Sequence, residues 1–206
     1  MIKKPMLLRK LKENNGSERK IIGLLGAHRG AGVTYTGVLI AYFFAVEKGI
    51  KTAYLECNNH RDFIRLQNSY EWDDEDDNSF SLDQITYYKQ VHKSQIAGIL
   101  NENYESYIID FGTDFISAKE DFMRCTSKII IGDRSVWNLS KTVSFLKNLE
   151  LIKGSNNWIH MIPCADQRAI VRMRNISGKY FCAVPYEEDP TSLSKRTSKM
   201  FHSLFY

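Results

Sequence analysis

Short runs of apolar residues alternate along the chain with longer stretches in which apolar residues recur at helical spacing. Most of the apolar runs are continuous, a pattern that is typical of strands buried on both faces of a sheet. We therefore expect six strands, at residues 20–25, 52–56, 107–111, 128–132, 158–162 and 180–184.

Helical patterns fill the intervals between these strands, at residues 34–47, 95–101, 118–125, 139–149, 166–174 and 192–205. Gly49 lies just beyond the first of them and is a suitable residue for ending a helix. Residues 68–80 carry an acidic run, EWDDEDD, and are interpreted as a surface loop. Regular alternation of helices with buried strands predicts an α/β fold with a doubly wound, mostly parallel sheet and helices on both faces.

The length and charge of the chain refine this expectation. A chain of 206 residues suits one α/β domain with a large core. The net charge is +4, but residues 1–20 hold seven Lys or Arg and two Glu, which leaves −1 for the remainder. We predict a basic tail at residues 1–19 and a single domain at residues 20–206. A nearly neutral domain weakens the case for a general nucleic-acid binder.

Targeting signals and cysteines are also informative. No apolar run is long enough to span a bilayer, and the N-terminus lacks the apolar core of a signal peptide. Cys57, Cys125, Cys164 and Cys182 lie far apart without any Cys-x-x-Cys pair. These features predict a cytoplasmic protein with reduced, buried thiols.

A glycine-rich segment joins the first strand to the first helix and reads GAHRGAGVTYT over residues 26–36. Its position is that of a phosphate-binding loop, in which backbone N–H groups and a helix N-terminus converge on an anion. The usual pattern is Gly-x-x-x-x-Gly-Lys-Ser/Thr, and here Val33 stands at the lysine position and Thr34 at the hydroxyl position. The alternative is a glycine-rich turn in an unrelated α/β fold.

The same segment resembles the deviant phosphate-binding loop of the ParA/MinD-type ATPases, Lys-Gly-Gly-x-Gly-Lys-Thr-Thr. In that alignment, His28 stands at the signature lysine, Arg29 and Gly30 at the first two glycines, and Gly32 at the third glycine. Val33 stands at the nucleotide lysine and Thr34 at the first threonine. Both lysines of the family pattern are therefore missing.

Three further segments extend the resemblance over residues 20–206. Residues 52–58 are similar to the family's second strand, which ends in Asp-x-Asp, with Glu56 and Asn58 in the aspartate positions. Residues 107–110 resemble its apolar strand ending in aspartate, and this match is intact at Asp110. Residues 183–190 resemble its Val-Pro-Tyr-Asp segment beside the adenine site, with Pro185 at the proline.

This resemblance implies a P-loop NTPase-like domain that binds ATP or ADP with Mg²⁺ and forms a homodimer over the loop face. The implied nucleotide contacts are Gly26, His28, Arg29, Gly30, Ala31, Gly32, Val33, Thr34, Tyr35 and Pro185. Thr34 and Asp110 would hold the Mg²⁺, and Asp110 would be the catalytic residue by ordering a metal-bound water. The degenerate loop is similar to that of the TadZ/CpaE-type members, which position pilus-assembly machinery.

The departures from the pattern leave alternatives open. A lysine contact to phosphate is worth about 1.5–3 kcal/mol, so its loss predicts nucleotide binding that is weaker by about ten- to a hundredfold. Arg29 or His28 is a candidate to replace the charge; otherwise Arg29 faces solvent and His28 bonds locally. Glu56 either lies near the metal or caps the following loop, and Asp110 either faces the phosphates or begins a turn.

These observations predict a scaffold or positioning protein with an impaired nucleotide site, whose partner belongs to a secretion, pilus or positioning system. A working Mg²⁺-dependent ATPase is the first alternative. A nonspecific DNA-binding partition protein is the second, with Arg168, Arg172 and Arg174 as a basic helix face that is otherwise simply solvated.

Two charged segments also allow two interpretations. The acidic residues 73–77 are either a solvated loop or a docking surface anchored by Trp72. The basic tail contains Met6, Leu7, Leu8 and Leu11, and is either disordered or an amphipathic element that contacts a membrane or a partner.

Overall fold

A computed structural model describes residues 19–70 and 78–206 of the chain. Its strands form one sheet in the order β3-β4-β2-β5-β1-β6-β7-β8. The strands are β1 (Lys20–Gly26), β2 (Thr52–Glu56), β3 (Ser79–Leu82), β4 (Ile85–Tyr88), β5 (Ser106–Asp110), β6 (Ser127–Ile131), β7 (Ile159–Pro163) and β8 (Cys182–Val184).

The helices of the described residues are α2 (Val33–Tyr42), which continues into a π-helical turn η1 (Phe43–Glu47), then α3 (Asp62–Ser69), α4 (Lys93–Leu100), α5 (Phe115–Arg124), α6 (Leu139–Glu150), α7 (Gln167–Ser177) and α8 (Lys195–Phe205). Two short 3₁₀ turns, η2 (Val136–Asn138) and η3 (Ser155–Asn157), lie on either side of α6.

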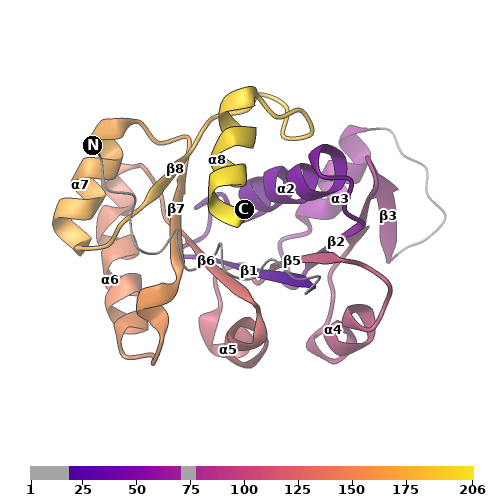
Figure 1. The fold of residues 1–206 in the computed structure, drawn as a ribbon. Helices are drawn as coiled ribbons and strands as arrows, with labels where there is room; N and C mark the ends of the chain where they lie inside the picture. The colour runs from indigo at the N-terminus through magenta and orange to yellow at the C-terminus, as the bar shows by residue number, and fades with distance from the viewer. Residues whose placement is uncertain (1–18, 71–77) are drawn as a thin grey trace.

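Every neighbouring strand pair is parallel except β3 with β4. Figure 1 shows α2, α3 and α8 on one face of the sheet and α4 and α5 on the opposite face. The expected α/β class, with a mostly parallel sheet covered on both faces, is confirmed.

The continuous apolar runs are explained by these two covered faces, because successive side chains of a strand point to opposite sides. In β1, Ile22 and Leu24 join the core beneath α2 and α8, whereas Leu25 joins the core beneath α4, α5 and α6. In β5, Ile108 and Ile109 divide in the same way.

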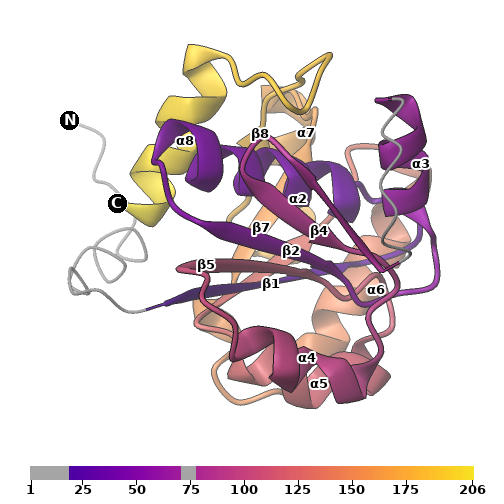
Figure 2. The ribbon, with the colours of Figure 1, turned by 90° about the vertical axis from the view of Figure 1, so that its right-hand side faces the viewer.

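The order in which strands are added to the sheet reverses between β1 and β5. The chain leaves β1 through α2 to reach β2 on one side, and leaves β5 through α5 to reach β6 on the other. In open α/β sheets, ligands bind at the carboxyl ends of the strands that flank such a point. Figure 2 shows α4 and α5 side by side below the sheet, opposite α2.

The surface-loop interpretation of residues 68–80 is wrong at both ends. Ser69 ends α3, and Ser79–Leu82 is strand β3, in which Phe80 is buried. The strand was missed because it is short and edge-located and directly follows an acidic run. That run, like the basic tail up to residue 18, lies outside the described residues.

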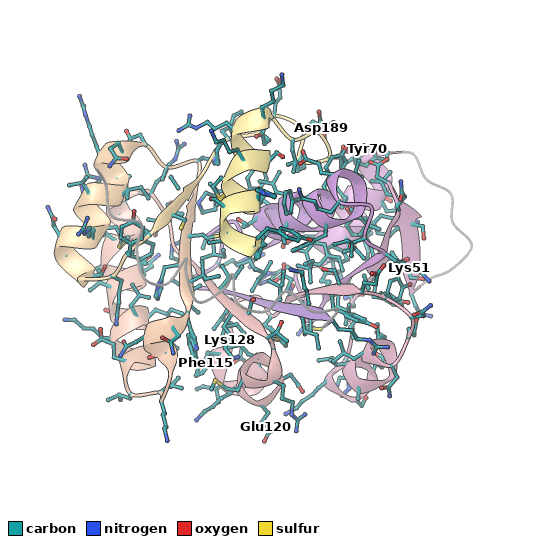
Figure 3. The ribbon with its side chains drawn as sticks, in the orientation of Figure 1. Lys51, Tyr70, Phe115, Glu120, Lys128 and Asp189 are labelled. Carbon is teal, nitrogen blue, oxygen red and sulfur yellow. The ribbon has the colours of Figure 1, made fainter. Side chains whose placement is uncertain are left out.

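Helix α3 was also not expected, and its position depends on contacts from distant parts of the chain. Tyr70, just after α3, donates a hydrogen bond to Asp189 at 3.1 Å and lies 3.1 Å from the hydroxyl of Thr191. Figure 3 labels Tyr70 and Asp189 at the same edge of the molecule. The helix is thus tied to the segment between β8 and α8.

The cysteines are free thiols, as expected, but only Cys125 is buried, and the other three are partly exposed. The expectation of four buried thiols is therefore wrong, because Cys57, Cys164 and Cys182 lie at strand ends rather than within the core. No helix among residues 19–70 and 78–206 is long and apolar enough to cross a membrane.

Candidate functional site

The glycine-rich loop begins at the carboxyl end of β1, at the point where the strand order of the sheet reverses. The Gly26 N–H donates to the carbonyl of Gly112 after β5 at 2.8 Å, and the Ala27 N–H donates to the carbonyl of Ile131 in β6 at 2.9 Å. The start of the loop is therefore fixed by backbone bonds to the strands on both sides.

Two glycines then allow the chain to turn into α2. Gly30 and Gly32 have φ values of +83° and +91°, a backbone conformation that residues with a side chain rarely adopt. A Cβ atom on Gly32 would also lie 2.9 Å from Cγ of Pro163 at the end of β7. The loop therefore needs glycine at residue 32 for two independent reasons.

Val33, at the position of the expected lysine, is the first residue of α2 and is 7% exposed. Its Cγ2 lies 2.6 Å from the place where a Cβ on Gly26 would be. The side chain thus packs a methyl group against Gly26 and supplies no positive charge to the cavity that it lines.

Thr34, Asp62 and Asp110 converge next to the loop. The Thr34 hydroxyl lies 2.7 Å from Oδ2 of Asp110 and 3.2 Å from Oδ2 of Asp62, so it donates to either carboxylate. Oδ1 of Asp110 accepts a hydrogen bond from the Gly112 N–H at 2.8 Å. This arrangement brings together three oxygen-bearing side chains from α2, α3 and β5.

Asp110 is completely buried at the end of β5. Burial raises the pKa of Asp110 to about 6, while the hydrogen bonds from Thr34 and Gly112 limit the rise. A buried carboxylate at the carboxyl end of a central strand, facing a threonine hydroxyl, favours the interpretation that Asp110 faces the loop over that of a simple turn residue.

Glu56 is also buried, but its carboxylate is occupied by backbone groups. Oε1 accepts from the N–H groups of Asp62 at 2.6 Å and Phe63 at 3.4 Å, and Oε2 accepts from the Gln90 N–H at 3.4 Å. Burial raises the pKa of Glu56, and these bonds oppose the rise. Of the two roles considered for Glu56, the geometry favours capping of α3.

Asn58 supports the strand end rather than the loop cavity. Its amide group donates to the Asp110 carbonyl at 3.3 Å, and its side-chain oxygen accepts from the His60 N–H at 2.9 Å. The second aspartate position of the resemblance is therefore occupied by a residue that holds β2 and β5 together.

His28 and Arg29, the candidate replacements for lysine, lie differently. Nδ1 of His28 bonds the Arg29 carbonyl at 2.8 Å and must therefore carry the hydrogen. Nε2 of His28 is 3.7 Å from Asp133 and has no hydrogen-bond partner within the described ranges. Arg29 is exposed. His28 is thus held locally, whereas the Arg29 side chain is accessible to a ligand.

Tyr35 connects α2 to the segment after β8. Its hydroxyl accepts from the Glu187 N–H at 2.7 Å and donates to the Glu187 carbonyl at 3.1 Å. Burial raises the pKa of Tyr35, so the phenol remains a donor at neutral pH. Pro185 lies two residues before Glu187 and is thereby held near the loop end of α2.

A cavity of about 230 Å³ lies over the loop and is lined by residues 28–35 together with His60, Asp62, Gly112 and Thr113. Of the predicted site residues, Gly26, Asp110 and Pro185 do not line it. Asp62 and His60 were not predicted from the sequence. Asp62 had one available signal, since it shortly follows the strand that pairs with β5.

Magnesium fits the donor set at this position. Thr34, Asp62 and Asp110 offer hydroxyl and carboxylate oxygens, which Mg²⁺ prefers. The described part of the chain contains no group of three or more His, Cys, Asp or Glu side chains arranged for a metal. The protein would therefore supply only part of a shell, as is usual when phosphates and water supply the rest.

The three arginines considered for DNA contact, Arg168, Arg172 and Arg174, are all exposed on α7. Arg174 stacks over the ring of Tyr180 at 5.6 Å, which engages its guanidinium. They lie on a different helix from those that flank the loop cavity.

No protein-family model matches the sequence, and no curated protein matches it. Solved structures do match in fold. The chain is similar to the ParA family ATPase of Chlorobium tepidum, with a TM-score of 0.59 and 14% identity, over 92% of this chain and 91% of that one. It is similar to a putative plasmid partition protein of Borrelia burgdorferi bound to AMPPNP, with a TM-score of 0.63 and 13% identity, over 91% and 97%.

A third similar structure is a chain of the MinC:MinD cell division protein complex of Aquifex aeolicus, with a TM-score of 0.65 and 12% identity, over 90% of this chain and 94% of that one. At this level of identity the likeness establishes the fold alone. The chain has the single-domain P-loop fold of the ParA/MinD proteins.

Proposed function

We propose that this chain, which has the fold of ParA/MinD proteins, is a positioning or scaffold protein with an impaired nucleotide site. It acts through a homodimer and through contacts with a partner protein, and its narrower role is the localisation of pilus-assembly machinery by a TadZ/CpaE-like protein. It works in the cytoplasm, and the basic tail contacts the inner face of the membrane.

The observation that carries this proposal is Val33, buried under Gly26 where a lysine would approach the phosphates. A charge-assisted bond of this kind contributes about 1.5–3 kcal/mol, which corresponds to about ten- to a hundredfold in affinity. Hydrolysis would suffer more than binding, because negative charge grows on the transferring phosphoryl group.

The rest of the loop supports descent from a nucleotide site. The left-handed glycines, the backbone bonds to β5 and β6, and the Thr34–Asp110 pair are retained. Thr34, Asp62 and Asp110 would hold Mg²⁺, which when bound would neutralise phosphate charge. The direct test is a titration of ATP and ADP into the wild type and into Val33→Lys, in which the substitution should restore tight binding.

Large apolar side chains at the loop end of the sheet support a protein interface there. Ile116 is 88% exposed at the start of α5, and Val136 and Trp137 are 61% and 91% exposed just after β6. Asp133, three residues before Val136, faces His28 of the loop. A homodimer formed over this face would bury all three side chains.

A weak Mg²⁺-dependent ATPase is the second candidate. It is favoured by Arg29, which lines the loop cavity, is exposed and makes no ion pair within residues 19–70 and 78–206. In that case Arg29→Ala and Asp110→Ala should each abolish turnover, while the exposed Arg61→Ala should retain it. Turnover no higher than a buffer blank would exclude this candidate.

A further inference from the structure

A second cleft lies beside the loop cavity, between the N-terminal ends of α4 and α5. Its volume is about 550 Å³, within the usual range of about 300–1,000 Å³ for small-molecule sites. It opens above β2 and β5, at the edge of the sheet where ligands of α/β proteins bind. The proposed function does not use this cleft.

The floor of the cleft is apolar. Val91, Ile96, Phe111 and Ala118 all line it, and all are less than 9% exposed. They come from the segment before α4, from α4 itself, from the end of β5 and from α5. An apolar floor of this kind fits the hydrocarbon part of a ligand rather than a fully hydrated ion.

One wall of the cleft is acidic. Asp114, Ser117, Ala118 and Asp121 line the cleft and recur at helical spacing along α5. Asp114 accepts hydrogen bonds from the backbone and hydroxyl of Ser117 but makes no ion pair within the described residues. Among the residues that the structure describes, Asp121 pairs only with the exposed Arg124, at 3.3 Å.

The opposite wall does not balance these carboxylates. Lys93 lines the cleft, but its ammonium group lies 2.9 Å from Glu120, which does not line it. Figure 3 labels Glu120 on the outer side of α5. The charge of Lys93 is thereby compensated outside the cleft, and the carboxylate at the rim that makes no ion pair within the described residues is that of Asp114, an exposed residue.

We propose that the cleft between α4 and α5 binds a small organic molecule that has an apolar body and a primary amino group. The body lies on Val91, Ile96 and Phe111, and the ammonium group is bound by Asp114 with support from Asp121. His60 and Thr113 line both this cleft and the loop cavity, so the ligand would lie next to the phosphate end of the loop.

The test uses the full chain without nucleotide and three probes that share one body: 2-phenylethylamine, 2-phenylethanol and phenylacetate. Saturation-transfer NMR and calorimetry should give the amine a Kd of about 1 mM or tighter. The alcohol and the carboxylate should bind at least about fivefold more weakly. Absence of amine binding, equal binding of amine and alcohol, or preferred binding of phenylacetate would overturn the proposal.

Two pairs of variants locate the site. Asp114→Asn retains the helix cap and removes the charge, and should weaken amine binding about fivefold, whereas Asp166→Asn, the same change at the exposed N-cap of α7, should not. Ala118→Phe should fill the cleft and abolish binding, whereas Ala97→Phe on the exposed side of α4 should not. Equal effects within either pair would place the probe elsewhere. Because no nucleotide is present, these results are independent of the proposed function.

Discussion

The hydroxyl of Thr34 lies 2.7 Å from a carboxylate oxygen of Asp110, although 76 residues separate them. The contact joins the first turn of α2 to the carboxyl end of β5, and it forms because β1 and β5 are neighbours in the sheet. It places a hydroxyl and a buried carboxylate beside the glycine loop, where both could serve a metal-bound phosphate. The stability of the folded chain should depend on pH through this buried carboxylate.

Asp110→Asn should therefore stabilise the protein above pH 6. The folded-state pKa of about 6 exceeds the ordinary value of 3.8, so ionisation favours the unfolded chain as pH rises between these values. Removing that cost should raise the free energy of unfolding at pH 7.5 by about 2–3 kcal/mol, and by little at pH 4. Urea unfolding at both pH values measures this.

The control for that experiment is Asp166→Asn, because Asp166 is an exposed carboxylate that caps α7 and asparagine retains the cap. It should leave the pH dependence of stability unchanged. If Asp110→Asn is destabilising at pH 7.5, burial does not raise the pKa of the Asp110 carboxyl group in the folded protein.

Glu56→Ala should destabilise the fold through loss of a cap rather than loss of a metal ligand. It would leave the N–H groups of Asp62, Phe63 and Gln90 without their acceptor, at a cost of about 2–4 kcal/mol. Hydrogen exchange should rise at those three amides, while the exposed Glu105→Ala should have little effect. Unchanged exchange at Asp62 and Phe63 would contradict the capping role.

Gly32→Ala should cost more stability than Gly49→Ala. Both glycines have positive φ, +91° and +66°, but a Cβ on Gly32 would strike Pro163 whereas Gly49 faces open space. We expect about 1 kcal/mol for Gly49→Ala and at least about 2 kcal/mol for Gly32→Ala. Equal losses in denaturant unfolding would mean that the loop does not rest on β7.

Trp137→Ala should weaken self-association if the proposed dimer forms over the loop face. A tryptophan that is 91% exposed beside the glycine-rich loop is a strong candidate for an interface anchor, and its removal should raise the dimer Kd at least about tenfold. Sedimentation at several concentrations measures this. Leu151→Ala, equally exposed at the end of α6, is the matched control and should leave the dimer intact.

The sheet was largely predictable because its central strands are buried on both faces and therefore apolar throughout. Ile108 and Ile109, for example, serve opposite cores. The hairpin of β3 and β4 was not, since β3 and β4 each have only four residues and β3 closely follows an acidic run, so the alternation of Ser79 and Ser81 with Phe80 and Leu82 is too short to stand out. The extended conformation of such an edge strand depends on its pairing with the neighbouring strand.

The site was predictable only in part, for a physical reason. The loop directly follows an apolar strand and Asp110 ends another, so both could be found by position. Helix α3 could not, because its N-terminus is capped by Glu56, six residues earlier in the chain, and its entry residue Arg61 has a left-handed backbone. For Asp62, the position shortly after β2 was the one signal in the sequence, and the Glu56 contact that fixes α3 adds no local pattern to it.

The measurement that most directly tests the impaired site is calorimetric titration of ATP and ADP, each with Mg²⁺, into the wild type, Val33→Lys and Val33→Met. Methionine is unbranched like lysine, one atom shorter, and carries no charge. We expect Val33→Lys to bind at least about tenfold more tightly than the wild type, and Val33→Met to bind no better. If the wild type binds nucleotide with a micromolar Kd equal to that of Val33→Lys, the missing lysine has not impaired the site, and the central claim is wrong.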